Sequence, residues 1–173
     1  MITECIRVEW SKLNPAIFLE FPSTEKSMKK ISTLQEHLRK KNPSSLGLYI
    51  HIPFCRVRCQ FCAFYVKPYY QEYVEAFLSS LVQEIKSYGE LSALNAIFVD
   101  SVYFGGGTPT VLSAKQLVTV LDNIERVFRL SAEAELSLEA HPSTINFENL
   151  TMLRSRGFNR LSIGAQSFDD HEL

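Results

Sequence analysis

Three cysteines, Cys55, Cys59 and Cys62, lie close together in the stretch LYIHIPFCRVRCQFCAF, and Phe64 stands where a fourth would continue the series. The chain has 4 cysteines in all, and the remaining one, Cys5, lies far upstream. A disulfide framework therefore explains the group poorly. Thiolates at this spacing instead indicate a metal or cluster site.

The number of thiolates limits which metal centre the loop could hold. A structural zinc site normally has four protein ligands, but Phe64 is apolar and His51 precedes the loop. Three cysteines suit a [4Fe-4S] cluster in which one iron stays open to a substrate or cofactor. Three ordinary buried cysteines, or a catalytic zinc with three cysteines and water, remain as alternatives. Arg56 and Arg58 flank the site, and we expect these cations to favour the thiolate form.

A second segment that could contact a ligand is VYFGGGTPT, which contains Gly105, Gly106, Gly107 and Thr108. Glycine lets a backbone approach a ligand closely. No lysine follows, although a phosphate-binding P-loop requires one. Taken alone, the run is as typical of a flexible turn as of a ligand site.

The whole chain has the composition of a globular protein. It has 173 residues, of which 46% are hydrophobic, enough for one domain with a core. With 18 Lys and Arg against 19 Asp and Glu, the net charge of -1 gives no reason to expect nucleic acid or an anionic membrane as a partner. The first residues, MITECIRVEW, do not resemble a signal peptide, and no long apolar run predicts a membrane span. We expect a protein of the reducing cytoplasm with a small-molecule or polypeptide partner.

Strand-like and helix-like segments alternate from Leu48 onward, which predicts an α/β fold of parallel β/α units. One expected helix begins at Ser113 with Gln116 three residues later, a capping box, and another closes near Gly89. Expected strands are LYIHIPF, IFVDSVYF, AELSLEAHP and NRLSIGAQSF; expected helices cover residues 70–88, 113–128 and 147–157, and DDHEL reads as the first turn of a fourth.

Residues 1–45 differ from the rest and are expected to form an N-terminal extension, with residues 46–173 as the main domain. Residues 25–41 predict one amphipathic helix with a solvated basic face, and residues 42–47, NPSSLG, predict a linker. The apolar positions of that helix are Met28, Ile31, Leu34 and Leu38.

Side-chain parity in the expected strands predicts one apolar and one polar face. Ser137 and Glu139 share one face of the third strand, opposite Leu136, Leu138 and Ala140. A flat sheet covered by helices on both sides is apolar on both faces, so the polar face predicts a cavity inside a curved, barrel-like sheet. The same face is expected to hold Tyr49 and His51, Tyr103 and Gly105, and Ser162, Gly164 and Gln166.

These motifs resemble a known family. CRVRCQFC has the CxxxCxxC spacing of the radical S-adenosylmethionine (SAM) superfamily. Together with LYIHIPFC, VYFGGGTPT, LEAHP and RLSIGAQSFDD, it resembles the oxygen-independent coproporphyrinogen III oxidase-like (HemN/HemW-type) family, which includes heme-chaperone and methyltransferase relatives. The resemblance implies a partial (βα) barrel of six units. About four are readable here, so we expect a truncated chain.

The resemblance also implies residue roles, although it assigns no catalytic residue. Cys55, Cys59 and Cys62 are similar to the ligands of a [4Fe-4S] cluster whose open iron chelates the amino and carboxylate groups of SAM. Implied SAM contacts are Phe61 near adenine, Gly105, Gly106, Gly107 and Thr108 at the methionine amino end, Glu139 at the ribose hydroxyls, and Gln166. Tyr49, on the same face, is expected to contact the cofactor or to serve the structure, and His51 has the same two interpretations.

The activity implied is reductive cleavage of SAM to methionine and a 5'-deoxyadenosyl radical, which abstracts hydrogen from a substrate carbon. In the oxidases this leads to decarboxylation of a porphyrinogen propionate in heme biosynthesis, with an electron donor such as flavodoxin or ferredoxin. Those oxidases usually carry another cysteine where this chain has Phe64, which is similar to the heme-chaperone branch. His141 replaces a common asparagine and is expected to be neutral. An oxidase-like enzyme, a heme-binding protein, a methyltransferase and a cluster-binding interaction module all stay open.

Overall fold

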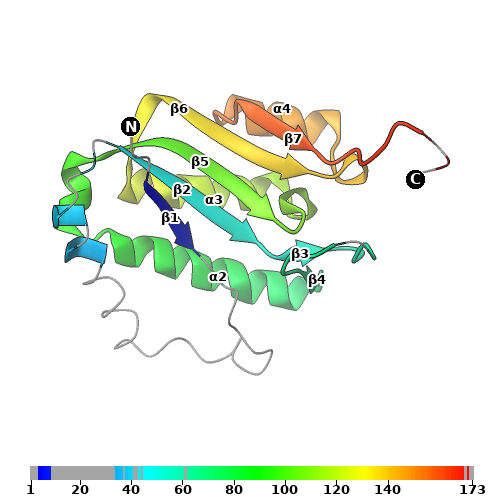
Figure 1. Cartoon of the computed structure of the whole chain (residues 1–173), viewed down its shortest axis with the longest axis horizontal. Coiled ribbons are helices and arrows are strands. Elements are labelled where there is room, and N and C mark those ends of the chain that lie inside the picture. Colours follow the sequence, from blue (N-terminus) through cyan, green and yellow to red (C-terminus); the bar gives the residue numbers. More distant parts are fainter. Residues whose placement is uncertain are drawn as a thin grey trace.

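The computed structural model describes residues 4–8, 34–36, 38–40, 43, 45–60, 62–169 and 171. Within them, five strands form one parallel sheet in the order β1-β2-β5-β6-β7 (Figure 1). The predicted α/β class with parallel strands is confirmed. The strands are β1 (Glu4–Val8), β2 (Ser45–Ile52), β5 (Phe98–Gly106), β6 (Arg129–Ala140) and β7 (Arg160–Ile163).

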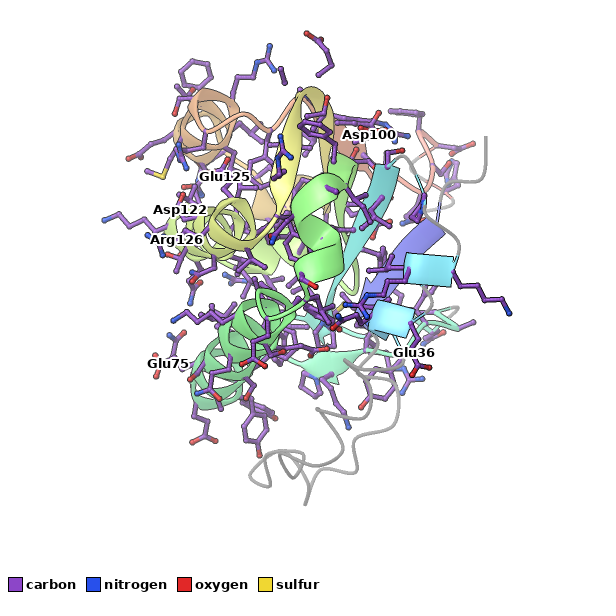
Figure 2. All side chains as sticks on the ribbon, turned by 90° about the vertical axis from the view of Figure 1, so that its left-hand side faces the viewer. Glu36, Glu75, Asp100, Asp122, Glu125 and Arg126 are labelled. Atoms are coloured by element: carbon purple, nitrogen blue, oxygen red, sulfur yellow. The ribbon has the colours of Figure 1, made fainter. Side chains whose placement is uncertain are left out.

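Helices α2 (Gln71–Tyr88), α3 (Ala114–Val127) and α4 (Phe147–Ser155) form a layer on one side of the sheet (Figure 2). Glu75 on α2 and Asp122 and Glu125 on α3 lie on the side of this layer that faces away from the sheet (Figure 2). Short 3-10 helices η2 (Ser92–Ala96), η3 (Pro109–Val111) and η4 (Pro142–Thr144) complete the connections. In the described part of the chain, no helix is long and apolar enough to cross a membrane.

The core lies between the sheet and these helices. Alternate residues of β2, β5 and β6 point into it, as the parity predicted. Each fully buried aliphatic or aromatic side chain there stabilises the fold by roughly 1.5–3 kcal/mol. The core contains Leu48, Ile50, Ile52, Val102, Phe104, Leu136 and Leu138 from the strands, and Val74, Phe77, Leu81, Leu117, Leu121 and Ile124 from α2 and α3.

Local capping explains where the helices begin and end. At α3, Ser113 Oγ accepts from the Gln116 N–H at 3.3 Å, and Gln116 Oε1 accepts from the Ser113 N–H at 2.8 Å. The predicted capping box is confirmed. Asn146 Oδ1 caps α4 by accepting from the Asn149 N–H at 2.8 Å. The predicted end of α2 at Gly89 is also confirmed.

The amino-terminal part of the sheet differs from expectation. Strand β1 was not predicted, yet it pairs in parallel with β2 from Glu4 opposite Leu46 to Val8 opposite Ile50. The linker predicted over residues 42–47 is wrong from Ser45 onward, because β2 already begins there and Leu46 is buried. Of the predicted amphipathic helix, Leu38 is buried in the core and Leu34 packs against it, while Met28 and Ile31 lie outside the described residues.

The last strand is shorter than predicted. Strand β7 ends at Ile163, where NRLSIGAQSF predicted a strand to Phe168. The parity argument for Gln166 is therefore wrong, since that residue follows the strand and has a φ of 64°. Leu161 and Ile163 share the helix-facing side with Leu138 and Ala140 but are 36% and 47% exposed. Most of DDHEL lies outside the described residues.

Candidate functional site

The carboxyl ends of β2, β5, β6 and β7 lie at one end of the sheet (Figure 1). There β2 leads through Pro53 into β3 (Phe54–Cys55), which pairs in parallel with β4 (Lys67–Pro68). The Lys67 N–H donates to the Pro53 carbonyl at 2.7 Å, and the Tyr69 N–H donates to the Cys55 carbonyl at 3.0 Å. The loop that carries the three cysteines is therefore fixed at both of its ends.

The three thiols lie on this one loop. Cys55 and Cys62 are half-buried, Cys59 is exposed, and all three are free of disulfides. The Cys62 N–H donates to the Cys59 carbonyl at 3.1 Å, which closes a turn between them. No three His, Cys, Asp or Glu side chains among the described residues lie close enough together to hold a metal ion. The loop presents the predicted ligands without gathering them, and Phe61 lies outside the described residues.

The electrostatics of Cys55 differ from expectation. Burial is the largest cause that raises the pKa of its thiol, and the nearby Cys62 and Cys59 thiols raise it further. A hydrogen-bond contact with Thr108 opposes this shift. Neither Arg56 nor Arg58 is among the causes of this shift, so the expectation that these cations favour the thiolate is not met at Cys55. The Arg56 guanidinium instead lies over the Tyr69 ring, 5.8 Å from its centroid.

The glycine-rich segment lies against the strand that leads into the cysteine loop. The Gly107 N–H donates to the Ile52 carbonyl and the Thr108 N–H donates to the Phe54 carbonyl, both at 2.8 Å. Thr108 Oγ1 lies 3.5 Å from Cys55 Sγ. The structure thus brings the two sequence motifs into direct contact.

The glycines are required by the packing of the protein itself. A Cβ atom at Gly105 would lie 2.7 Å from a ring carbon of Tyr103, and one at Gly107 would lie 2.7 Å from the Phe54 carbonyl oxygen. Gly106 has a φ of +117°, and a Cβ there would lie 2.6 Å from the His51 ring. Gly105 and Gly106 belong to β5, so this part of the run is not a flexible turn. Their role beside a ligand stays a prediction.

Glu139 occupies the polar face, as the parity of β6 predicted. Its Oε1 accepts from the Tyr103 hydroxyl at 2.6 Å, and its Oε2 accepts from the Gly106 N–H at 3.0 Å. Tyr49 lies opposite Tyr103 in the β2–β5 register, and Tyr103 lies opposite Ser137 in the β5–β6 register. The predicted polar face is therefore continuous over three strands.

Gln166 and His141 follow the carboxyl ends of β7 and β6. Gln166 is exposed beyond the end of β7. His141 is also exposed, and its Nδ1 accepts from the Ser143 N–H at 3.2 Å, so it caps η4. The expectation that His141 is a neutral variation stays a prediction.

The interaction of Tyr103 with Glu139 was missed from the sequence. Tyr103 was assigned to the polar face, but no partner was predicted for its hydroxyl. The strand register contains the signal, because Tyr103 lies opposite Ser137, two residues before Glu139 on the same face. The register is a property of the paired strands β5 and β6 and is not contained in either segment alone.

The CxxxCxxC loop, the glycine-rich segment and the Glu139 carboxylate thus lie together at the carboxyl end of a parallel α/β sheet, the end at which α/β proteins of this class hold their ligands. The family model described as "Radical SAM superfamily" matches residues 49–173, and the chain belongs to this superfamily.

Two curated relatives have different names. The chain is 37% identical over 126 residues to "Heme chaperone HemW" of Bacillus subtilis (strain 168), which covers 72% of this chain and 33% of the relative. It is 38% identical over 125 residues to "Oxygen-independent coproporphyrinogen III oxidase" of Escherichia coli (strain K12), which covers 72% of this chain and 27% of the relative. The chain thus spans about a third or less of the length of these relatives.

A solved structure agrees with the family assignment. The chain superposes with a TM-score of 0.74 and 34% identity on a structure entitled "Coproporphyrinogen III oxidase (HemN) from Escherichia coli is a Radical SAM enzyme". The match covers 81% of this chain and 32% of the other. The resemblance expected from the motifs is confirmed at the level of the family, and the relatives do not separate oxidase from heme chaperone.

Proposed function

We propose that residues 46–173 bind a [4Fe-4S] cluster and SAM in one site at the carboxyl ends of the strands. We also propose that residues 1–45 are an extension that adds β1 to the sheet beside β2. The observation that carries the proposal is the contact of Thr108 Oγ1 with Cys55 Sγ at 3.5 Å. It places the thiol loop beside the glycine-rich segment, whose Gly106 N–H holds Glu139. The residues proposed as cluster ligands and those proposed as cofactor contacts thus adjoin one another.

The donor set fits an iron-sulfur cluster better than a hard cation. Cys55, Cys59 and Cys62 would supply three thiolates, and soft sulfur ligands select iron-sulfur clusters or zinc over magnesium and calcium. One iron without a protein ligand would then be open to the amino and carboxylate groups of SAM. When bound and reduced, this cofactor pair supplies a 5'-deoxyadenosyl radical that removes hydrogen from a substrate carbon.

Hydrogen bonding of the glycine-rich segment limits how it can meet SAM. The N–H groups of Gly106, Gly107 and Thr108 already donate to Glu139, Ile52 and Phe54. These three N–H groups are therefore engaged within the protein, and the Thr108 carbonyl accepts from the Val111 N–H at 2.9 Å. We propose that carbonyl oxygens of the glycines meet the ammonium group of the methionine end. In this arrangement Glu139 accepts from the ribose hydroxyls. Tyr49, Phe61 and Gln166 are proposed as further contacts.

The proposed reaction class is hydrogen abstraction from a tetrapyrrole, as in the coproporphyrinogen III oxidases, with an electron donor such as flavodoxin or ferredoxin. Heme binding of the chaperone type is the second candidate, because Phe64 lies 71% exposed on the cysteine loop and a relative of similar identity is named a heme chaperone. A methyltransferase of the same family is the third. The free thiols suit the reducing cytoplasm, which we propose as the location.

The test of cofactor binding is anaerobic reconstitution with iron and sulfide, followed by electron paramagnetic resonance of the dithionite-reduced protein with and without SAM. We expect a [4Fe-4S]⁺ signal that changes when SAM is added. The signal should be lost when Cys55, Cys59 and Cys62 are all replaced by Ala. The matched control is Cys5→Ala, which removes a thiol outside the loop and should leave the signal intact.

Either of two results would end this proposal: absence of any cluster, or zinc bound in preference to iron. If the cluster signal does not change when SAM is added, the chain is an iron-sulfur protein that does not bind SAM at its cluster. Heme titration followed by absorbance then distinguishes the second candidate. Saturable heme binding that survives loss of the cysteines favours the chaperone type, whereas SAM cleavage without heme binding favours the enzyme.

A further inference from the structure

The Glu139 carboxylate is held at both of its oxygens before any ligand arrives. Tyr103 on β5 donates its hydroxyl to Oε1 at 2.6 Å, and the Gly106 N–H donates to Oε2 at 3.0 Å. The two donors come from the same strand, three residues apart, while Glu139 comes from β6. The position of the carboxylate therefore depends on β5 as well as on its own backbone.

With these two hydrogen bonds made, the Glu139 carboxylate can still accept further hydrogen bonds. An ionised carboxylate has about four lone-pair positions, two on each oxygen. Tyr103 and Gly106 occupy one position on each oxygen of Glu139. One acceptor position on each oxygen remains, and a vicinal diol has two hydroxyl donors to match them.

Packing holds the Tyr103 ring in place. The ring stacks on Tyr49, with centroids 6.0 Å apart and an interplanar angle of 17°. Gly105 makes room for this pair, because a Cβ there would lie 2.7 Å from the Tyr103 ring and 3.1 Å from the Tyr49 ring. The Tyr49 hydroxyl lies 3.2 Å from His51 Nδ1. The stack with Tyr49 thus orients the Tyr103 hydroxyl toward Glu139.

Burial and the neighbouring carboxylate keep the Tyr103 phenol protonated. Burial is the largest cause that raises its pKa, followed by the hydrogen bond to Glu139 and the charge of that carboxylate. Tyr49 raises the pKa slightly further and Arg160 lowers it, and the result is a pKa of about 12. The phenol therefore remains protonated, and a hydrogen-bond donor, near neutral pH.

We propose that Tyr103 is a positioning residue: its hydroxyl holds the Glu139 carboxylate so that the two remaining acceptor positions meet the ribose hydroxyls of the adenosyl cofactor. The inference rests on the proposed function, in which Glu139 contacts the ribose. It goes beyond that function because Tyr103 acts through Glu139 and contributes no ligand contact of its own.

The test measures the dissociation constant of SAM for the reconstituted, cluster-loaded chain by titration calorimetry. Tyr103→Phe keeps the ring and its stack but removes the donor. We expect SAM binding to weaken about tenfold, the low end of what a hydrogen bond to a charged group contributes, because the Glu139 carboxylate must then be ordered when SAM binds. Tyr88→Phe is the matched control, because Tyr88 also donates to a carboxylate, Glu84, at 3.2 Å in α2. The control should stay within about twofold of the unchanged chain.

A second comparison separates positioning from a general structural role. In a Glu139→Gln background, Tyr103→Phe should weaken SAM binding much less than it does alone, because effects acting through one group are not additive. In the cluster-free chain, Glu139→Gln should lower the pKa of Tyr103 from about 12 toward the ordinary 10.0. Ring-labelled tyrosine followed by NMR across alkaline pH reads this pKa, with the signal assigned by its loss in Tyr103→Phe.

The outcomes distinguish failure of the inference about Tyr103 from failure of the proposed function. If the unchanged, cluster-loaded chain does not bind SAM, the proposed function and this inference both fail. If it binds SAM and Tyr103→Phe binds equally well, the inference alone is overturned. Fully additive losses in the double variant, or a Tyr103 pKa that ignores Glu139→Gln, would overturn it as well.

Discussion

Gly106 shows how much a single residue decides at this site. Its φ of +117° is a conformation that residues with a Cβ rarely adopt, and a Cβ added there would lie only 2.6 Å from the His51 ring. The same residue supplies the N–H that holds Glu139 Oε2. We therefore expect Gly106→Ala to lower the free energy of unfolding by about 1–3 kcal/mol. Urea unfolding followed by circular dichroism measures this change.

The control for this prediction is Gly164→Ala. Near Gly164, the closest neighbour of an added Cβ would be the Gln166 amide nitrogen at 3.0 Å, at the end of a side chain that can move. We expect this substitution to leave the unfolding midpoint close to that of the unchanged chain. Equal midpoints for the two variants would show that neither the positive φ nor the contact with His51 constrains Gly106.

Residue types and spacing predicted the cysteine loop, the glycine-rich segment and the polar position of Glu139, because each can be identified from the sequence of one short segment. Contacts between segments were not legible in the same way. The hydrogen bond from Tyr103 to Glu139 depends on the register between β5 and β6. The raised pKa of Cys55 depends on burial, which the charges of neighbouring Arg56 and Arg58 do not reveal.

At the scale of elements, helix α3 owes its start to a local device. Ser113 and Gln116 exchange hydrogen bonds between side chain and backbone across the first turn. Ser113→Ala removes the acceptor for the Gln116 N–H, and we expect it to lower the free energy of unfolding by about 1 kcal/mol. Thr119→Ala serves as the control, since the Thr119 hydroxyl also bonds within α3, to the Lys115 carbonyl, but caps nothing. A loss in both variants alike, measured by urea unfolding, would contradict the capping explanation.

The ends of the helices were predicted well because capping and hydrophobic periodicity are local properties. The ends of the strands were not, since a strand extends as far as a neighbour pairs with it. Strand β2 begins at Ser45 because it pairs with β1 and β5, although NPSSLG has the composition of a linker. Strand β7 ends at Ile163, although the alternation continues to Gln166.

At the scale of the whole molecule, the sheet presents β7 as its last strand within the described residues. All four residues of β7 are exposed, and Leu161 and Ile163 are apolar. An edge strand with unpaired backbone groups and exposed apolar side chains favours pairing with another copy. The isolated chain is therefore expected to self-associate with increasing concentration.

Ile163→Lys tests this property of the sheet edge. A lysine on an edge strand opposes pairing because association would bury its charge. We expect light scattering to show a lower average mass at high concentration for this variant than for the unchanged chain. Ala132→Lys adds the same charge at an exposed position of β6 and is expected to leave the association unchanged. If both lysines reduce the mass equally, net charge rather than the β7 edge controls association; if the unchanged chain stays monomeric throughout, the edge is not adhesive at all.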